Sequence, residues 1–206
     1  IAVKRITGAT SIEKVLQELL AEGGTLGISR LRYHWCKSFD DHMELISVDA
    51  VGQSKATTDM LKQGKLREYL SFGSLSRSHA FWCLFCNQPI VFCGTPESNV
   101  VATSDFSMTC PVVTLTDDRC RKVIGEKSDW WLEVPLIIAG RPYGKLSCDL
   151  RGEPTDSSMI PQIIRFWMLA RLVAPLLELL RQSQHPEQGP EPIDDWKMHT
   201  CLLYTS

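Results

Sequence analysis

The sequence has no excess of charge of either sign and no uninterrupted apolar run. Its 206 residues hold 22 Lys and Arg against 24 Asp and Glu, which gives a net charge of −2 and a pI near 6.2. Without a basic patch there is no electrostatic basis for binding nucleic acid or anionic lipid. The most apolar stretch, residues 158–182, is interrupted by Arg165 and Arg171, so we expect no membrane span. With 44% hydrophobic residues, the chain is predicted to form one soluble, cytoplasmic domain.

Familiar catalytic and metal-binding motifs are also missing. No Walker loop, Rossmann fingerprint or Ser-His-Asp order occurs, and the five histidines lie far apart in the sequence. The eight cysteines are scattered, which is typical of reduced thiols in the cytosol rather than of a disulfide framework. Cys83 and Cys86 form a C-x-x-C motif, but there is no second closely spaced pair to complete a metal site. We therefore expect no metal and no cofactor.

The clearest structural pattern lies between Trp131 and Leu150, where two strands are predicted. Their shared apolar face is formed by Leu132, Val134, Leu136, Ile138, Gly144, Leu146, Cys148 and Leu150. Their other face carries Glu133, Lys145, Ser147 and Asp149. To align the apolar rows, we expect Ile138 to pair with Gly144 and Leu136 with Leu146, around a connection formed by residues 140–142.

Helices are predicted near both ends of the chain. Thr10 and Glu13 form a capping-box pattern ahead of an apolar stripe that stops at Gly23. Residues 28–51 alternate in polarity on both sides of a polar turn, which indicates a β-hairpin. Residues 158–182 have the amphipathic spacing of a long helix that could cover the sheet.

These elements together resemble a GAF domain, the small sensory module of signalling proteins. The residues that match the C-terminal pattern of that family are Val134, Pro135, Leu136, Gly140, Gly144, Leu146, Asp149, Leu169, Ala170, Ala174 and Leu177. Residues 10–35 resemble the first helix and first strand of the family. The resemblance implies an α+β fold, with a central antiparallel sheet of five or six strands. It places the N- and C-terminal helices on one face of the sheet, and loops and short helices on the other.

The resemblance covers roughly residues 9–183, which we interpret as the domain, preceded by an upstream segment at 1–8. Residues 184–200 are Pro-rich and acidic, and we interpret them as a linker. The last six residues, CLLYTS, equal the translation of a sequencing-adapter end. We expect residues 201–206 to be read-through on a truncated environmental gene and to carry no function.

The resemblance implies a sensory or regulatory role in a signalling or transcription-control protein. Small ligands of the family lie between the sheet and the segment that links its middle strands. In this sequence the candidate ligand-binding residues are Trp82, Cys86, Asp105, Asp117, Arg119 and Trp130. The Asn-Lys dipeptide of cyclic-nucleotide-binding members and the Cys-His of bilin-binding members are missing, so the ligand class stays open.

Two other functions remain as alternatives. Cys83, Cys93 and Cys120 echo the spacing of free methionine-(R)-sulfoxide reductases, GAF-type enzymes in which a thiolate attacks the sulfoxide and a second thiol resolves the product. In that interpretation the three thiols meet in one accessible pocket, and otherwise we expect no catalytic residue. The third function is a scaffold domain that only dimerises.

The C-terminal helix carries two apolar rows, of which a sheet needs only one. One row is Leu169, Leu172, Leu176 and Leu179, and the other is Ile163, Trp167, Ala170, Ala174 and Leu177. We expect the second row to cover the sheet and the first to form a homodimer, the output arrangement that the GAF resemblance implies.

Overall fold

The computed structural model describes residues 2–38, 42–53, 67–71, 83–84, 87–93, 113–116, 130–151 and 159–184. The helices are α1 (Ala2–Thr7), α2 (Ile12–Gly23), the 3-10 turn η1 (Gly24–Leu26) and α6 (Met159–Gln184). The strands are β1 (Ile28–Ser38), β2 (His42–Val51), β3 (Arg67–Ser71), β4 (Ile90–Cys93), β5 (Val113–Thr116), β6 (Trp130–Ile138) and β7 (Arg141–Leu150).

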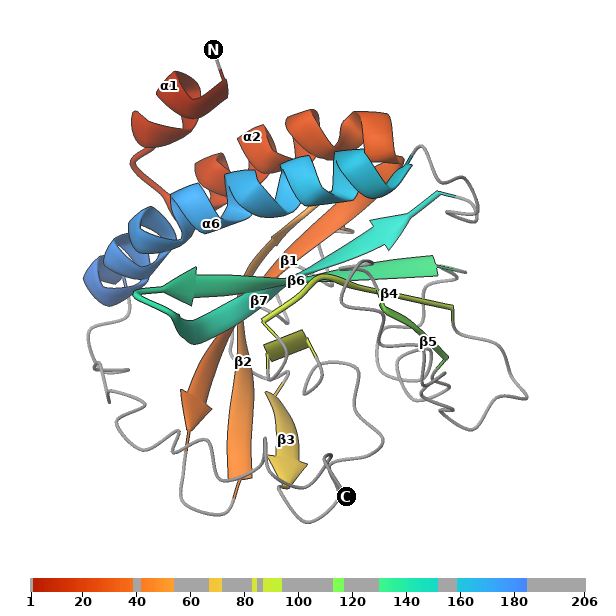
Figure 1. The fold of residues 1–206 in the computed structure, drawn as a ribbon. Coiled ribbons are helices and arrows are strands. Elements are labelled where there is room, and N and C mark those ends of the chain that lie inside the picture. Colours follow the sequence, from red (N-terminus) through yellow and green to blue (C-terminus); the bar gives the residue numbers. More distant parts are fainter. Residues whose placement is uncertain are drawn as a thin grey trace.

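One twisted sheet organises the described part of the chain, with strand order β3-β2-β1-β7-β6-β4-β5. Figure 1 shows α2 and α6 side by side on one face of this sheet. The neighbours from β3 to β4 are all antiparallel, as predicted. At the edge, β5 adds a seventh strand that runs parallel to β4, which the prediction of five or six strands did not include. A parallel neighbour needs a long connection, and residues 94–112 supply one.

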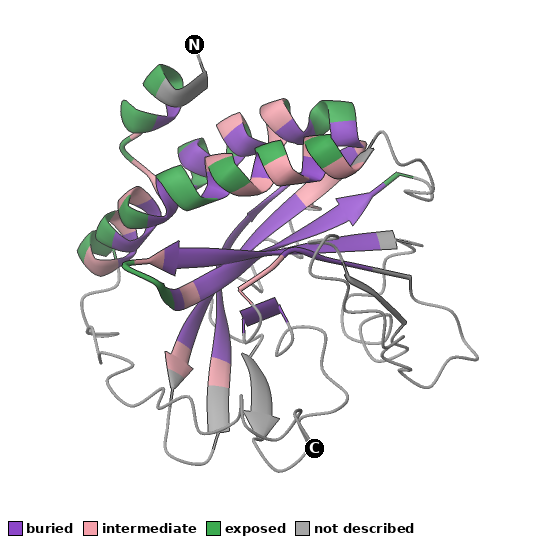
Figure 2. Ribbon diagram, viewed as in Figure 1, coloured by how far each residue is buried: buried purple, intermediate pink, exposed green. Residues whose placement is uncertain are grey.

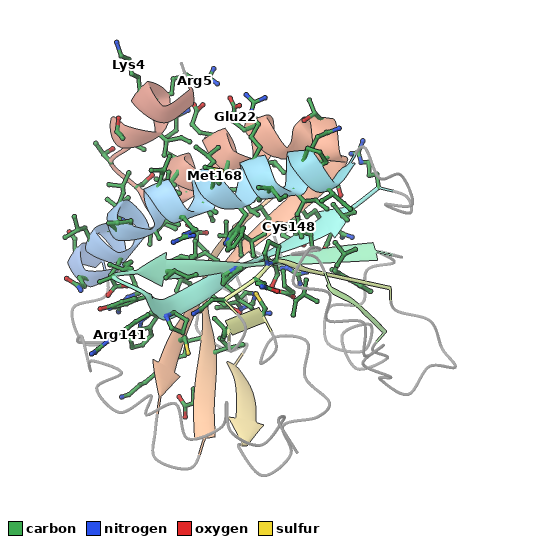
Figure 3. The ribbon with its side chains drawn as sticks, viewed as in Figure 1. Lys4, Arg5, Glu22, Arg141, Cys148 and Met168 are labelled. Atoms are coloured by element: carbon green, nitrogen blue, oxygen red, sulfur yellow. The ribbon has the colours of Figure 1, made fainter. Side chains whose placement is uncertain are left out.

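The first long helix begins one residue later than the capping pattern predicted. Ser11, rather than Thr10, is the N-cap of α2, because the Ser11 Oγ accepts a hydrogen bond from the Lys14 N–H at 3.2 Å. Before it, α1 packs on α2: Ile6 is fully buried, and Arg5 bridges to Glu18 and Glu22. Figure 3 labels Arg5 and Glu22 at this contact. The predicted hairpin at residues 28–51 is confirmed by the pairing of β1 with β2.

The faces of β6 and β7 are as predicted, but their register is not. Leu136 pairs with Gly144, not Leu146, and the connection is the two-residue turn Ala139–Gly140 with φ of 50° and 80°. Positive φ at both turn residues gives a turn whose twist matches that of the flanking strands, which is why tight hairpins favour it. A bulge on β7, in which Tyr143 is the extra residue, shifts the alternation of side chains on β7 by one position. Both apolar rows therefore still face the helices.

The core lies between the sheet and the helices. Leu136 and Leu146 are 2% and 0% exposed, and both belong to one cluster with Ile163 and Leu177 of α6. This confirms the prediction that they share a face beneath the last helix. The other face of the middle strands is also largely buried: Arg32 is 4% and Asp149 2% exposed, and β6 and β7 are purple near their centres in Figure 2. The middle of the sheet is therefore dry on both sides.

Candidate functional site

The buried face of the sheet opposite α2 and α6 is polar. Its residues lie on four neighbouring strands, in register: Arg32 pairs with Ser147 and His34 with Lys145, across β1 and β7. On the flanks, Ser47 of β2 is opposite His34, and Glu133 of β6 is opposite Ser147. Directly opposed residues of antiparallel strands point to the same side of a sheet, so these side chains form one group. We call the following set the polar cluster: Arg30, Arg32, His34, Ser47, Glu133, Lys145, Ser147 and Asp149.

One half of the polar cluster is built around Glu133. The Lys145 Nζ lies 2.8 Å from the Glu133 Oε2, and both side chains are 3% exposed. The Ser147 Oγ donates to the same carboxylate, at 2.9 Å from Oε2 and 3.1 Å from Oε1. The carboxylate is thus neutralised and hydrogen-bonded, which a buried charge requires.

The other half is built around Asp149, which receives two arginines. The Arg30 Nε lies 2.6 Å from the Asp149 Oδ2, and the Arg32 Nη2 lies 2.7 Å from Oδ1. Arg32 is 4% exposed, and its Nε–H has no hydrogen-bond partner among the described residues. Beside this half, the His34 Nδ1 and the Ser47 Oγ are 2.9 Å apart. The cluster therefore combines satisfied ion pairs with one buried donor that is still available.

Cys36 and Cys148, two of the thiols that the structure describes, are poor nucleophiles. Cys36 lies on the polar face, opposite Leu45, and burial raises the pKa of its thiol above the ordinary range. Burial, and then the charges of Glu133 and Asp149, likewise raise the pKa of Cys148. Cys148, labelled in Figure 3, lies in the sheet layer beneath α6. Protonated, buried thiols do not attack substrates.

The residues predicted from the sequence lie mostly outside the described ranges. Cys83 is buried in a short helical turn with Leu84, and Cys93 ends β4, while Trp130 pairs with Leu150. Five further candidates fall outside the described residues: Trp82, Cys86, Asp105, Asp117 and Arg119. Cys120 does too, so whether three thiols share a pocket stays a prediction.

The sequence did show the polar row of β6 and β7, but an alternating strand looks the same when it faces solvent. A hint lay in the Arg30-x-Arg32-x-His34 alternation of β1, whose charges would need partners if that strand were central. Trp131 also lies beside the polar cluster and was not among the predicted site residues: it pairs with Asp149 and is 3% exposed. The sequence does not indicate that both faces of the sheet are buried, and without that information the polar row could not be predicted to form a site.

A different polar contact anchors α6 on the helix face. Arg181 is fully buried, and its Nε and Nη2 lie 2.9 and 2.6 Å from the two carboxylate oxygens of Glu178. The Arg181 guanidinium stacks 4.0 Å from the ring centroid of Trp35 on β1. Burial and the nearby Glu178 raise the pKa of Tyr33, the neighbouring β1 residue on this face, while Arg181 offsets part of the shift. We call Glu178, Arg181 and Trp35 the α6 clasp.

Neither a metal site nor a membrane span is found in the described ranges. No three His, Cys, Asp or Glu residues there are grouped closely enough to hold a metal ion. None of the described helices combines the length and apolar character needed to cross a bilayer.

Comparison with known proteins reveals relatives in structure rather than in sequence. No family model and no curated protein matches the chain. A GAF domain from a phosphoenolpyruvate-protein phosphotransferase of Coxiella burnetii is 16% identical, with a TM-score of 0.58 over 89% of this chain and 92% of that one. A methyl-accepting chemotaxis protein fragment is 15% identical, with a TM-score of 0.54 over 88% of this chain and 99% of the fragment.

A GAF domain/HD domain protein from Geobacter sulfurreducens is similar to the same degree. It is 12% identical, with a TM-score of 0.54 over 84% of this chain and 97% of that one. Identities this low establish architecture and leave the ligand and activity of each relative with that relative. The sheet order, the shared face of the terminal helices and these matches agree that the chain has the GAF fold.

Proposed function

We propose that this chain is a cytoplasmic sensory or regulatory domain that binds a small molecule on the polar cluster and passes the signal through α6 to a second copy. The observation that carries the proposal is the burial of charged residues at the centre of the sheet. Burying ions costs several kcal/mol each, and well-packed apolar side chains of similar volume often give equal or greater stability. Stability alone does not account for the cluster, whereas recognition of a ligand does.

The relay rests on β1, whose residues alternate between the two faces. Arg32 and His34 belong to the polar cluster, while Tyr33 and Trp35 belong to the core beneath α6. In the α6 clasp, Arg181 stacks directly on Trp35. A ligand that shifts β1 would therefore move the contact that holds the end of α6, and packed interfaces respond to such shifts in discrete steps.

The partner surface is the outward side of α6. Met168, Leu172 and Leu179 are 60%, 67% and 64% exposed, and their spacing with the exposed Pro175 follows the three-four rhythm of a helix–helix seam. In the row predicted to cover the sheet, Ile163, Ala170, Ala174 and Leu177 are buried and Trp167 is half-buried. In the row predicted for the partner, Leu169 and Leu176 are half-buried, so the exposed stripe contains Met168 and Pro175 in their place. A second copy presents the same stripe, so two α6 helices can pair about a twofold axis.

A paired-variant screen tests ligand binding. Lys145→Met with Glu133→Gln removes both charges of the cluster while keeping volume, so the domain should still fold. Lys14→Met with Glu18→Gln makes the matched change in a salt bridge whose Lys14 is exposed on α2. Small metabolites are screened by thermal shift: we expect at least one to raise the Tm of wild type and of the α2 variant, but not of the cluster variant. If nothing in a broad library binds wild type, the ligand-free scaffold replaces this proposal.

Light scattering tests the partner. Wild type at high micromolar concentration should be a dimer, and Leu172→Glu with Leu179→Glu should be a folded monomer, because charges would be buried in the seam. Gln17→Glu with Gln184→Glu adds the same charge at exposed polar positions, one on α2 and one at the end of α6, and should stay dimeric. A monomeric wild type would contradict the relay between copies.

A further inference from the structure

The unpaired Nε–H of Arg32 is the most specific chemical feature of the polar cluster. The guanidinium is 4% exposed, and its Nη2 is held by Asp149 at 2.7 Å. The nearby carboxylates are already used: Asp149 binds Arg30 and Arg32, and Glu133 binds Lys145 and Ser147. A buried N–H without an acceptor loses the hydrogen bond that it made to water, and native proteins pair more than about 90% of such groups. A ligand oxygen placed at this atom would restore a hydrogen bond.

The charges of the cluster point to the sign of that oxygen. Among its described residues, three cations (Arg30, Arg32 and Lys145) face two anions (Glu133 and Asp149), which leaves one positive charge. The nearby Asp49 pairs opposite Tyr33, in the row of the other face, and its Oδ1 accepts from the Ala50 N–H. An acceptor oxygen that carries a negative charge complements this excess of cations among the described residues, and a dry interior strengthens its hydrogen bond to the guanidinium.

The surroundings also bear on the rest of the ligand. Trp131 pairs with Asp149, and Ile90 of β4 pairs with Glu133, so both lie on the cluster's side of the sheet. Both residues are buried, at 3% and 0% exposure. An apolar body beside the charged group would contact them. A phosphate monoester fits less well, since it offers three acceptor oxygens where the described residues of the cluster leave one donor unpaired.

We propose that the polar cluster binds the carboxylate of a small apolar organic acid, with the Arg32 Nε–H as its specific donor. This inference rests on the proposed small-molecule function and names the ligand class of the same site. Asp149 is then a positioning residue, because its Oδ1 holds the Nη2 of the guanidinium that carries the Nε–H. Glu133, neutralised by Lys145, leaves the acid without a competing carboxylate.

The test compares acids with their uncharged amides. Acetate, hexanoate, benzoate and phenylacetate are each titrated against the full chain at pH 7 and fixed ionic strength, beside the matching primary amide and inorganic phosphate. We expect at least one apolar acid to raise the Tm and to bind at least about tenfold more tightly than its amide and than phosphate, as a charge-assisted hydrogen bond predicts. Acids and amides that behave alike would overturn the inference while a library hit kept the broader function.

A conservative variant assigns the effect to Arg32. Arg32→Lys keeps a cation for Asp149 but has no Nε–H, so we expect the Kd of the preferred acid to rise at least about tenfold. Arg5→Lys makes the same exchange at the half-exposed surface of α1 and should leave the Kd unchanged. Equal binding by Arg32→Lys would overturn the inference.

A spectroscopic readout covers the case in which Arg32→Lys does not fold. In wild type, the Arg32 Nε–H can be followed by nitrogen-15 NMR during the acid titration. We expect its resonance to move at the same acid concentration that raises the Tm. A resonance that stays fixed while the acid binds would place the carboxylate elsewhere and overturn the assignment.

Discussion

The two faces of the central sheet are both largely buried but chemically opposite. Toward α2 and α6, β1 presents Tyr33 and Trp35 to an apolar core in which Arg181 and Glu178 form the buried ion pair. On the other face, the same strand presents Arg32 and His34 to a cluster held by ion pairs. Neighbouring residues of one strand thus serve two different environments.

This difference distinguishes the residues that stabilise the fold from the residues that can bind a ligand. An apolar face gains about 25 cal/mol for each Å² removed from water, whereas a charged face must first offset desolvation. The helix face therefore accounts for stability, and the polar face is where a ligand can alter the balance. The α6 clasp is the exception on the helix face, and it lies where the proposed signal leaves the sheet.

The largest expected effect comes from placing a single charge on the apolar helix face of the sheet. Leu146 is fully buried beneath α6, and Leu146→Asp would place a carboxylate there without a partner. We expect a loss of more than about 4 kcal/mol and no cooperative melting, measured by circular dichroism. Leu172→Asp introduces the same side chain at a 67% exposed position of α6 and should melt cooperatively. A normal melt for Leu146→Asp would contradict the burial of this face.

The next effect concerns the α6 clasp. Glu178→Ala leaves Arg181 buried without its carboxylate, and we expect it to cost about 3 kcal/mol in urea unfolding. Glu178→Leu with Arg181→Met removes both charges and should restore stability to the wild-type value or above, because apolar packing on Trp35 replaces the pair. If the double variant is less stable than Glu178→Ala, the clasp contributes more than a compensated ion pair.

The same contrast explains which features could be predicted from the sequence. Strand alternation correctly placed Leu136 and Leu146 on one face, because a core imposes a period of two. The register failed because it depends on the positive φ of Ala139 and on the bulge at Tyr143, and neither has a clear local signature. The polar cluster could not be predicted from the sequence, because Arg32 and Asp149 are 117 positions apart. Only the order of the strands brings those two side chains together.

The smallest expected effect compares a thiol on each face. Cys36 on the polar face and Cys148 on the helix face are 2% and 0% exposed, and burial raises the pKa of both. In the unfolded chain these thiols ionise above about pH 8.5, whereas in the folded chain they stay protonated, so stability should fall as the pH rises above that value. Each thiol should contribute about 1.4 kcal/mol per pH unit to the decline.

Single variants measure whether the two faces are equally dry. Urea unfolding between pH 8 and pH 10 should show a shallower decline for Cys36→Ala than for wild type, because one buried thiol no longer resists ionisation. Cys148→Ala, on the apolar face, serves as the reference and should flatten the decline by a similar amount. If Cys148→Ala flattens the decline of stability with pH and Cys36→Ala does not, water reaches the polar face. The burial cost from which we infer a ligand site would then be smaller than the structure implies.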